Sequence, residues 1–558
     1  MLNFYQGPIR FSNYLFAAID VLARRRHMSI FVVFFLSFGG SWLWSLSQGI
    51  PIPYAQDEYS YLLAGDTFAH GRVTNPAHPM WIHFESFQVL QHPSYMSKYL
   101  PGQGIFLAAG QVLFGHPIYG VWLSAGLMCA AICWMLYAWV SPRWALIGGL
   151  VAALQFGIFT SWSQSYWGGA VPAIGGALVL GALPRIFKNQ CIRDALWLGL
   201  GCAILAISRP LEGFLVAVPV GCLVLPWKRF STVIPAKAGI HNKFIKKIIL
   251  PLSIILFITA LGMGAYNKQI TGNAAIFPYL LYTHTYREVP LFIWQPLTQV
   301  KFNHKMMELF EKNYTEKIYI DKKTWKGFFK AMQNDVFVMS MFFFGFPLAI
   351  PSLAVGLLLF FHRRKAARYW MALLILLVTC AIMTCIARTR YFSPLTCLAV
   401  LLIITGLRGL AGLKLRSVRL GLVFVMLLIF LQLFLNIILT RPLPATWSLA
   451  RKTQSSSVDG SNPFFTSLPA SFTREQLKDI LIKQGGKYLV IVRYPLWHIY
   501  HFEWVYNDSD IDHAPIVWAR DMDEEHNKEL LEYFKDRQAL LINVYWDSHE
   551  GTIRFDER

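Results

Sequence analysis

The sequence predicts a mainly α-helical protein, a bundle of about eleven membrane-spanning helices followed by a small α/β domain outside the membrane. The chain of 558 residues is 55% hydrophobic and only 15% charged, and its mean hydropathy is +0.42. Several uncharged runs reach about 20 residues, which is the length that a helix needs to cross the hydrocarbon core of a bilayer. Beyond residue 440 the chain becomes polar, and helical and strand patterns alternate there.

The first span is expected at about residues 28–46. The segment in front of it is basic, with Arg10, Arg24, Arg25 and Arg26. No cleavage site of small residues follows the span, so we expect an anchor rather than a signal peptide that is removed. The basic flank predicts a cytoplasmic N-terminus, and residues 48–116 then form a first periplasmic loop.

An adjacent acidic pair, Asp57 and Glu58, opens this loop. A helix is predicted to begin at the pair and to end before Gly71, because Asp favours helix starts and Gly favours the position after a helix end. On that helix Asp57 and Tyr61 share a face, whereas Asp66 points to the opposite side. The pair is expected to face one way, at the boundary of water and lipid. The alternative is that both acids only stabilise the first helical turn.

Ten further spans are expected along the chain. They lie at about residues 117–140, 144–163, 168–187, 195–208, 212–227, 247–266, 336–361, 369–387, 393–411 and 419–440. When the spans alternate between the two sides, the loops assigned to the cytoplasm are basic, and Asp194 is the only acidic residue in them. This distribution obeys the positive-inside rule, so the net charge of +20 sets the orientation and does not imply a nucleic-acid partner.

Two longer polar regions complete the predicted organisation. Residues 267–335 form a second periplasmic loop of mixed charge, with helical runs such as HKMMELFEKNY, that we expect to act as a lid. Residues 441–558 follow an odd number of spans and are expected as a periplasmic α/β domain with a partly parallel sheet, next to a transmembrane catalytic domain of residues 1–440. This tail has no Gly-rich phosphate loop, cysteine cluster or nucleophile elbow, so we assign it no chemistry.

We expect no cofactor and no metal ion. The eight cysteines all fall in or beside the spans, where small apolar thiols are usual, and they predict no disulfide framework. The first periplasmic loop contains residue types that bind metals, but their spacing is not that of a ligand set: His78, His83, Glu85 and His92.

Basic side chains from distant segments are expected at the same outer level as the acidic pair. Arg209 lies in the turn SRPLEG, three residues before Glu212, and Arg388 and Arg390 lie in ARTRYFSP, just before Tyr391. Charges at membrane depth usually line a cavity or pair with one another, and the planar fork of Arg suits phosphate. With Lys98 they predict a site that holds an anionic head group near Asp57. For each arginine alone, the alternative is snorkelling to lipid phosphates. For Tyr166 in QSYWGG, it is an interfacial aromatic belt.

These elements resemble the lipid-linked-sugar-dependent glycosyltransferases of the GT-C fold, in particular glycosyltransferase family 39, the protein O-mannosyltransferase and aminoarabinose transferase group. The acidic pair has the form DExxY at residues 57–61, and three further matches follow in order: KYLP at 98–101, SRPLEG at 208–213 and RYFSP at 390–394. The resemblance covers roughly residues 30–410. KYLP departs from the paired prolines usual in the family, which makes Lys98 a weaker match.

The resemblance implies an inverting glycosyltransferase that moves a monosaccharide from a polyprenyl phosphate to a glycan, lipid or protein acceptor. Asp57 would be the general base, and Glu58 would orient the acceptor or support Asp57. The leaving phosphate would be neutralised by Arg209, Arg388, Arg390 and Lys98. Residues expected to line the substrate are Tyr61, Tyr166, Glu212 and Tyr391. We expect the protein in the inner membrane of a bacterium, in contact with membrane lipids.

Two other functions stay open at this point. A transporter or flippase for a lipid-linked saccharide would bind phosphate with the same arginines. Transporters tend to show internal repeats and broken spans near the midplane, whereas this sequence shows no repeat and gathers its polar groups at the outer boundary. The second alternative is a non-enzymatic assembly protein that displays the tail domain.

Overall fold

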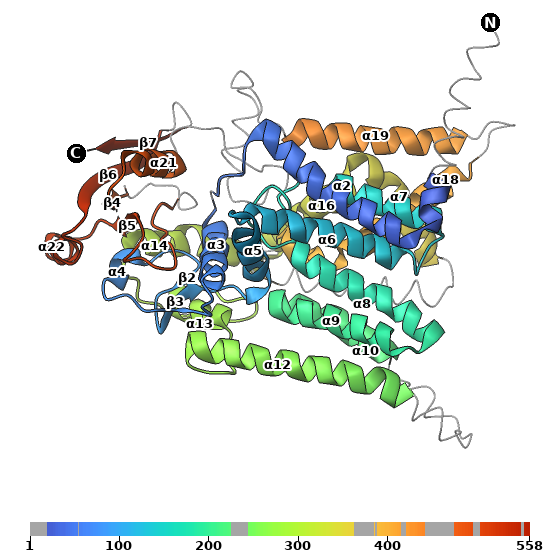
Figure 1. Ribbon diagram of the computed structural model, residues 1–558, viewed down its shortest axis with the longest axis horizontal. Helices are drawn as coiled ribbons and strands as arrows, with labels where there is room; N and C mark the ends of the chain where they lie inside the picture. Colours follow the sequence, from blue (N-terminus) through green and yellow to red (C-terminus); the bar gives the residue numbers. More distant parts are fainter. Residues whose placement is uncertain are drawn as a thin grey trace, which may run out of the picture.

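The computed structural model describes residues 19–53, 55–224, 244–361, 384, 388–413, 420–440, 474–494, 503–547 and 552–557. Its long helices lie side by side as a bundle, and the smaller elements gather at one end of that bundle (Figure 1). The C-terminal strands lie at this end as well, so the fold consists of a helical part and a smaller polar part stacked along one axis.

Seven helices among the described residues are long and apolar enough to cross a membrane. They are α2 (Arg26–Gln48), α6 (Ile118–Leu136), α8 (Ala170–Asn189), η3 (Ile245–Ile249) running into α12 (Leu250–Thr271), α16 (Trp325–Phe361), η5 (Thr389–Leu395) running into α18 (Thr396–Ala411), and α19 (Leu420–Thr440). Each coincides with a span expected from hydropathy. The predicted fold class, a multi-pass helical bundle with a small sheet domain, is confirmed.

The other expected spans are shorter helices or lie outside the described residues. α9 (Ile192–Ser208) and α10 (Pro210–Val224) meet at Arg209, because a proline suits the first turn of a helix but cannot continue the preceding one. α7 (Pro142–Ala152) continues as η1 (Ala153–Gly157) and ends before the predicted boundary at residue 163. The stretch that follows is rich in Ser and Thr, which bond to the backbone and compete with the helix. Of the expected span 369–387, only residue 384 is described.

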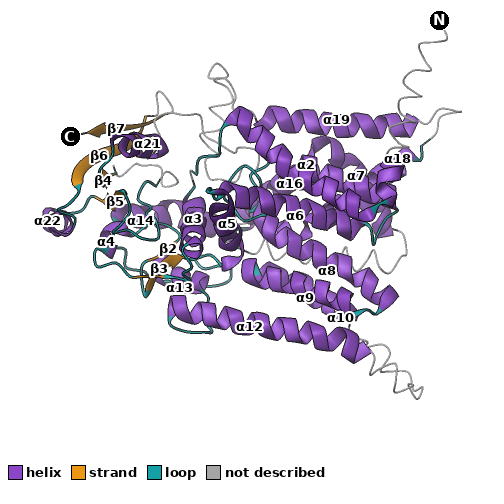
Figure 2. Ribbon diagram, viewed as in Figure 1, coloured by secondary structure: helices purple, strands orange, loops and turns teal. Residues whose placement is uncertain are grey.

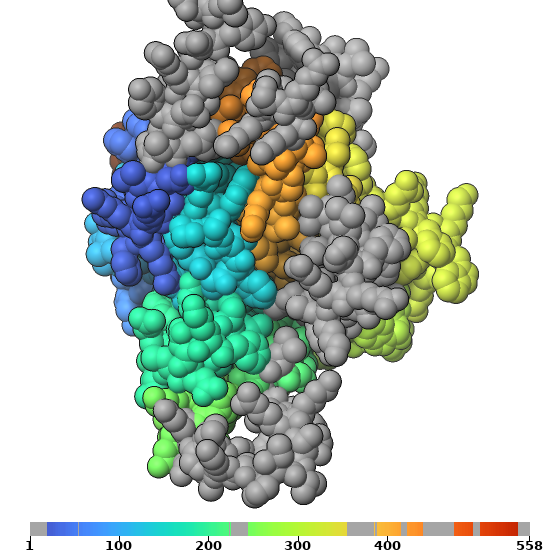
Figure 3. Space-filling view, turned by 90° about the vertical axis from the view of Figure 1, so that its right-hand side faces the viewer, coloured from blue at the N-terminus to red at the C-terminus, as the bar shows by residue number. Residues whose placement is uncertain are grey.

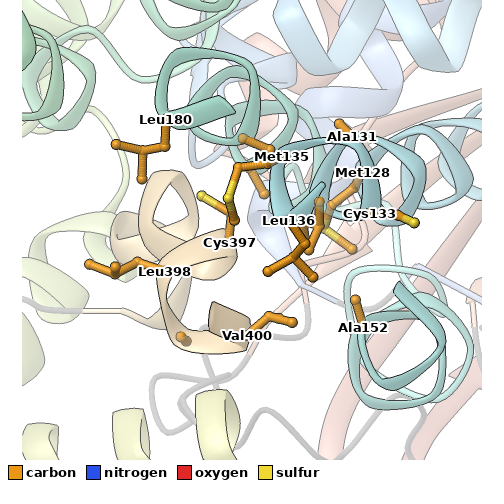
Figure 4. Close-up of a cluster of buried hydrophobic side chains, with 14 of the residues drawn as sticks. Met128, Ala131, Cys133, Met135, Leu136, Ala152, Leu180, Cys397, Leu398 and Val400 are labelled. Atoms are coloured by element: carbon orange, nitrogen blue, oxygen red, sulfur yellow. The ribbon is translucent and has the colours of Figure 1, made fainter. Parts of the chain in front are cut away.

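α6 and α8 occupy the centre of the bundle. In the most apolar stretch of each helix, 78% of the residues of α6 and 83% of those of α8 are buried, against 28% for α2 and 11% for α12. Seen from the end opposite the sheet, α2, α6 with α7, and α18 occupy neighbouring sectors (Figure 3). At the centre, α6, α8 and α18 meet through apolar side chains, among them Leu136, Leu180 and Cys397 (Figure 4). Because lipid tails are equally apolar, close packing rather than transfer from water holds these helices together.

One close approach positions the start of α18. Gly176 of α8 lies against η5, and a Cβ added there would be 1.8 Å from the carbonyl oxygen of Pro394. No side chain can occupy that space, so glycine is what allows the backbone of η5 to contact α8. This contact holds the segment that carries Arg390 at the end of the bundle.

The two regions between spans form the layer beyond the bundle. The first contains α3 (Gln56–Ala69), α4 (Trp81–Phe84), α5 (Pro101–Phe114) and three short antiparallel strands in the order β1-β3-β2, which are β1 (Asn75–Pro76), β2 (Val89–Leu90) and β3 (Ser94–Ser97). α3 and α5 lie across the direction of the long helices (Figure 1). The second region contains α13 (Pro278–Tyr286), α14 (Lys305–Phe310), η4 (Glu311–Glu316) and α15 (Lys317–Lys323).

The tail forms a four-stranded sheet in the order β5-β4-β6-β7. Its elements are α21 (Arg474–Gln484), β4 (Tyr488–Arg493), β5 (Ile516–Arg520), α22 (Glu524–Tyr533), β6 (Gln538–Asp547) and β7 (Thr552–Glu557). β4 pairs in parallel with both β5 and β6, and only β6–β7 is antiparallel, in agreement with the predicted partly parallel sheet. Figure 2 shows these strands at the end farthest from the bundle. The serine-rich linker in front of α21 lies outside the described residues.

The tail packs directly on the first of the two regions between spans. Tyr506 stacks on Tyr59 of α3 with ring centroids 4.5 Å apart, and the backbone N–H of Ser509 donates to Asp66 Oδ2 at 2.9 Å. The side chain of His83 contacts the carbonyl oxygen of Arg520 at 3.0 Å. The sheet therefore supports the helix on which the acidic pair lies.

Candidate active site

A cavity of about 110 Å³ lies where α3, α13, η4, η5 and the α9–α10 turn meet. Its charged lining residues in the described part of the chain are Asp57, Glu311, Lys98, Arg209, Arg287, Arg388 and Arg390. Aromatic side chains form much of the remaining wall: Tyr99, Trp167, Tyr279, Tyr282, Phe310, Tyr314 and Tyr391. The cavity joins segments up to 333 residues apart, since Asp57 and Arg390 are in contact.

Asp57 lies in the first turn of α3 and both of its carboxylate oxygens are engaged. Arg390 Nη2 donates to Oδ2 at 2.5 Å, and the hydroxyl of Tyr99 donates to Oδ1. Burial alone would raise the pKa of Asp57, but Arg390, Lys98 and the Tyr99 hydroxyl together outweigh burial and lower the pKa from 3.8 to about 2. The carboxylate is therefore ionised throughout the physiological range.

Glu58 has a different environment from its neighbour. Its carboxylate accepts hydrogen bonds from the backbone N–H of Ala55 at 3.1 Å and from that of Tyr166 at 3.0 Å, and the residue is 1% exposed. It does not line the cavity. The expectation that the two carboxylates face one way is not met, because consecutive helical residues are about 100° apart. The contacts of Glu58 are instead those of a residue that stabilises the first helical turn, which was the alternative interpretation of the acidic pair.

The predicted arginines reach the cavity from η5 and from the α9–α10 turn. Arg390 lies over the ring of Trp167 at 5.0 Å, and Arg209 lies over the ring of Tyr391 at 4.9 Å. Glu212 lies 4.0 Å from Arg209, outside the cavity lining. The Nη2 atom of Arg209 is buried and has no hydrogen-bond partner among the described residues, which leaves a donor available to a ligand.

Lys98 is almost enclosed, with 3% of its surface exposed. Its ammonium nitrogen lies 5.2, 4.7 and 4.5 Å from the ring centroids of Tyr99, Tyr279 and Tyr282. Burial and the neighbouring Arg287 guanidinium lower the pKa of Lys98 to about 7, although Asp57 opposes the shift. Lys98 can thus change its charge near neutral pH.

The remaining predicted lining residues lie mostly behind the wall. Tyr391 lines the cavity, as expected, and Tyr61 stacks on the back of Tyr99 with centroids 4.3 Å apart. The hydroxyl of Tyr166 donates to the carbonyl of Pro51 at 3.0 Å. Among the described residues Tyr61, Tyr166 and Glu212 support lining residues or loops and do not line the cavity themselves.

The sequence analysis did not identify the residues that the second region between spans contributes to the cavity. Arg287 Nε donates to Glu311 Oε1 at 3.2 Å, and this second ion pair lines the same cavity as Asp57 and Arg390. One signal was present in the sequence, because helical spacing puts Glu311 on the apolar face of its helix, with Met307 and Tyr314. A charge on an apolar helix face indicates a partner or a ligand.

The residues with metal-binding side chains in the first loop are separately engaged. His78 Nε2 contacts Asp512 at 3.0 Å, Glu85 accepts from Asn303 at 3.2 Å, and His92 packs on the ring of Trp81. In the part of the chain that the structure describes, no group of three or more potential metal ligands comes together.

No protein-family model matches the chain, and no curated protein matches it. The chain is similar to solved structures of the oligosaccharyltransferase of Archaeoglobus fulgidus. The apo form is 10% identical over 93% of this chain and 69% of that one, with a TM-score of 0.46, and the form tethered to an acceptor peptide is 10% identical over 96% and 74%, also with 0.46. The complex of archaeal oligosaccharyltransferase AglB from the same organism with an inhibitory peptide and a dolichol-phosphate is 11% identical over 98% and 75%, with 0.43.

Proposed function

We propose that this protein is an integral membrane glycosyltransferase that moves a monosaccharide from a polyprenyl-phosphate donor to a periplasmic acceptor, which is a glycan, a lipid or a protein. The observation that carries the proposal is the cavity at the end of the bundle, in which the carboxylate of Asp57 lies among five basic side chains. The basic side chains can bind a phosphate leaving group, and the carboxylate can act as the base for an acceptor hydroxyl or amine.

In this proposal the basic residues hold the donor phosphate and stabilise the charge that grows on it as the glycosidic bond breaks. Arg209 and Arg390 offer planar donors suited to phosphate oxygens, and Arg388 and Lys98 add positive charge from the same cavity. The aromatic wall gives a sugar ring flat apolar surfaces on which to rest. The water-poor surroundings strengthen each of these electrostatic contacts.

Asp57 is proposed as the general base that takes the acceptor proton, with inversion at the anomeric carbon. Paired with Arg390 and Tyr99 it is a weak base, so the pair with Arg390 has to loosen before the proton is taken. A donor phosphate bound by Arg390 would loosen it. Glu58 is proposed to keep Asp57 in position by fixing the first turn of α3.

The remaining predictions fit one arrangement in the membrane. The N-terminus lies in the cytoplasm of a bacterium, the cavity opens at the periplasmic side of the inner membrane, and residues 441–558 form a periplasmic domain beside the transmembrane domain of residues 1–440. Since the tail packs on α3, we propose that it keeps the site in shape and contributes no catalytic group.

The test uses the purified full chain in nanodiscs with a radiolabelled polyprenyl-phosphate sugar and an envelope extract as acceptor. Transfer, or slow release of free sugar to water, is expected from the wild type. Asp57→Asn should lose both while still binding the donor, and Asp66→Asn on the far side of α3 should keep both. A carrier would move the labelled lipid across vesicles without releasing sugar, and that result would contradict the proposal.

A further inference from the structure

Gln88 has an unusual backbone conformation for a residue with a side chain. It lies in the turn directly before β2, and its φ of 68° is in the left-handed region that a Cβ disfavours. Its N–H donates to the hydroxyl of Tyr282 at 2.9 Å. Its carbonyl accepts from the hydroxyl of Ser60 at 2.6 Å and from the N–H of Lys98 at 3.2 Å. Among the described residues other than glycine, only Gln190 shares a positive φ, and it follows α8, where helix ends commonly take this conformation.

The side chain of Gln88 lines the cavity and leaves one acceptor unused. Its Nε2 donates to Gln56 Oε1 at 3.1 Å, and Gln56 lines the cavity as well. The Oε1 atom of Gln88 is buried and has no hydrogen-bond partner among the described residues. A buried amide oxygen without a partner costs free energy, and a ligand that donates to it removes this cost.

The hydroxyl of Tyr282 supplies a donor close to this acceptor. It accepts from the N–H of Gln88, and within the described part of the chain no group accepts its own proton. A phosphate or a carboxylate is only an acceptor and would leave Gln88 Oε1 unpaired. An ammonium group is only a donor and would leave the Tyr282 proton unpaired. A hydroxyl group is both donor and acceptor, so it can satisfy both.

These polar groups belong to the part of the cavity that suits a sugar. Gln56 directly precedes Asp57 in the first turn of α3, and Tyr282 lies on α13 with Tyr279, which lines the cavity too. The arginines proposed to bind the phosphate come from other segments, η5 and the α9–α10 turn. A sugar ring has apolar faces and hydroxyl groups along its edge, so aromatic rings beside hydrogen-bonding groups are its complement.

We propose that Gln88 and Tyr282 form the subsite that binds a hydroxyl group of the transferred sugar, and that Gln56 fixes the Gln88 amide for this contact. The inference rests on the proposed function in naming the sugar as part of the lipid-phosphate donor. It assigns the sugar to the segments around Gln88 and leaves the arginines to the single phosphate. A sugar without a hydroxyl group at the contacting position is bound more weakly, because the buried oxygen then lacks a partner.

The experiment measures binding to the full chain in phosphatidylcholine nanodiscs by calorimetry. The probes are farnesyl phosphomannose and farnesyl phosphoglucose, and the reference is farnesyl methyl phosphate, a diester of the same charge without a sugar. At least one sugar diester is expected to bind more tightly than the reference. Gln88→Met keeps the length of the side chain without the amide, and Gln88→Gly removes the side chain. Both should weaken binding of that sugar diester roughly three- to tenfold, as expected for a neutral hydrogen bond, and leave the reference unchanged.

Two further measurements separate binding from a structural role. Gln88→Gly should not lower the midpoint of thermal unfolding, because glycine adopts a positive φ freely. Gln91→Met is the matched control, since Gln91 is a buried glutamine outside the cavity lining whose Oε1 also lacks a partner among the described residues. It should cost stability, because Gln91 Nε2 donates to the carbonyl of Phe84 at 2.7 Å, and leave all affinities unchanged.

The inference is overturned if neither sugar diester binds the wild type more tightly than the reference, or if the preference survives in both Gln88 variants. Equal weakening of sugar diester and reference would overturn it too, because Gln88 would then only shape the cavity. So would a rise in the acceptor KM alone in the transfer assay, with donor binding unchanged. Because the titrations need no turnover, absent sugar transfer would contradict the proposed function and leave this result standing.

Discussion

Replacing the proposed base should tighten the binding of a lipid phosphate. Arg390 donates to Asp57 at 2.5 Å, so an incoming phosphate has to compete with this carboxylate for the guanidinium. Asp57→Asn keeps the shape of the side chain but removes the charge that holds Arg390. Removing a charged residue from a binding site usually weakens ligand binding. An increase in affinity for Asp57→Asn is therefore a strict test.

The size of the effect follows from the pKa of Asp57. The shift from 3.8 to about 2 is a net gain for the charged carboxylate in spite of its burial. At about 1.4 kcal/mol per unit, the surroundings of Asp57 favour its charged form by roughly 1–3 kcal/mol after the cost of burial is subtracted, and Arg390 makes the largest favourable contribution. Releasing Arg390 should therefore raise the affinity for farnesyl phosphate on the order of tenfold.

The assay is calorimetric titration of the full chain in nanodiscs with farnesyl phosphate, near neutral pH and physiological salt. Asp66→Asn removes a charge from the same helix outside the cavity, and Glu311→Gln removes one from the cavity without touching Arg390. Both should gain less than Asp57→Asn. An unchanged or lower affinity of Asp57→Asn, or an equal gain in an Arg390→Gln background, would refute the competition between carboxylate and phosphate.

Three further outcomes are expected. Lys98, whose pKa is lowered to about 7, is charged below that pH and binds the anion better in that form, so farnesyl phosphate affinity should fall as the pH rises from 7 to 9. The variant Lys98→Met should bind more weakly and independently of pH over this range, which titrations at several pH values would check. Tyr99→Phe removes the hydroxyl that holds Asp57 Oδ1 in place. The loss of orientation is expected to outweigh the gain in basicity, so kcat should fall by roughly 10- to 100-fold with little change in KM, measured in the transfer assay. Gly176→Ala forces η5 away from α8 and should lower thermal stability and transfer together, whereas Gly262→Ala, which has open space around it, should change neither.

Local patterns were sufficient for the elements themselves. The apolar runs predicted the seven long helices, because a segment without charges can satisfy its backbone in a bilayer only as a helix. In the tail, REQLKDILIKQ forms α21 (Arg474–Gln484), and the alternation of helix and strand predicted the parallel pairing of β4 with its neighbours. The same logic failed at the span expected to end at residue 163, where polar residues after η1 compete with the helix.

At the site, local sequence patterns predicted several of the cavity residues but not the orientation of each side chain. Its predicted members Asp57, Lys98, Arg209 and Arg390 do line one cavity, while the neighbouring Glu58 is turned to backbone N–H groups. Which face of a helix meets the cavity depends on how that helix is rotated against its neighbours, and the sequence of one helix does not specify this rotation.

By itself, the sequence determined the long helices, the alternation of helix and strand in the tail and the places along the chain where polar groups gather, because hydrophobic period and charge act over a few residues. The tertiary structure alone decided that Arg287 and Glu311, from the second region between spans, line the same cavity as Arg390. It also decided that the tail packs on α3 through Tyr506 and Tyr59. Such contacts between distant segments depend on the packing of the whole chain, and no local signal specifies their partners.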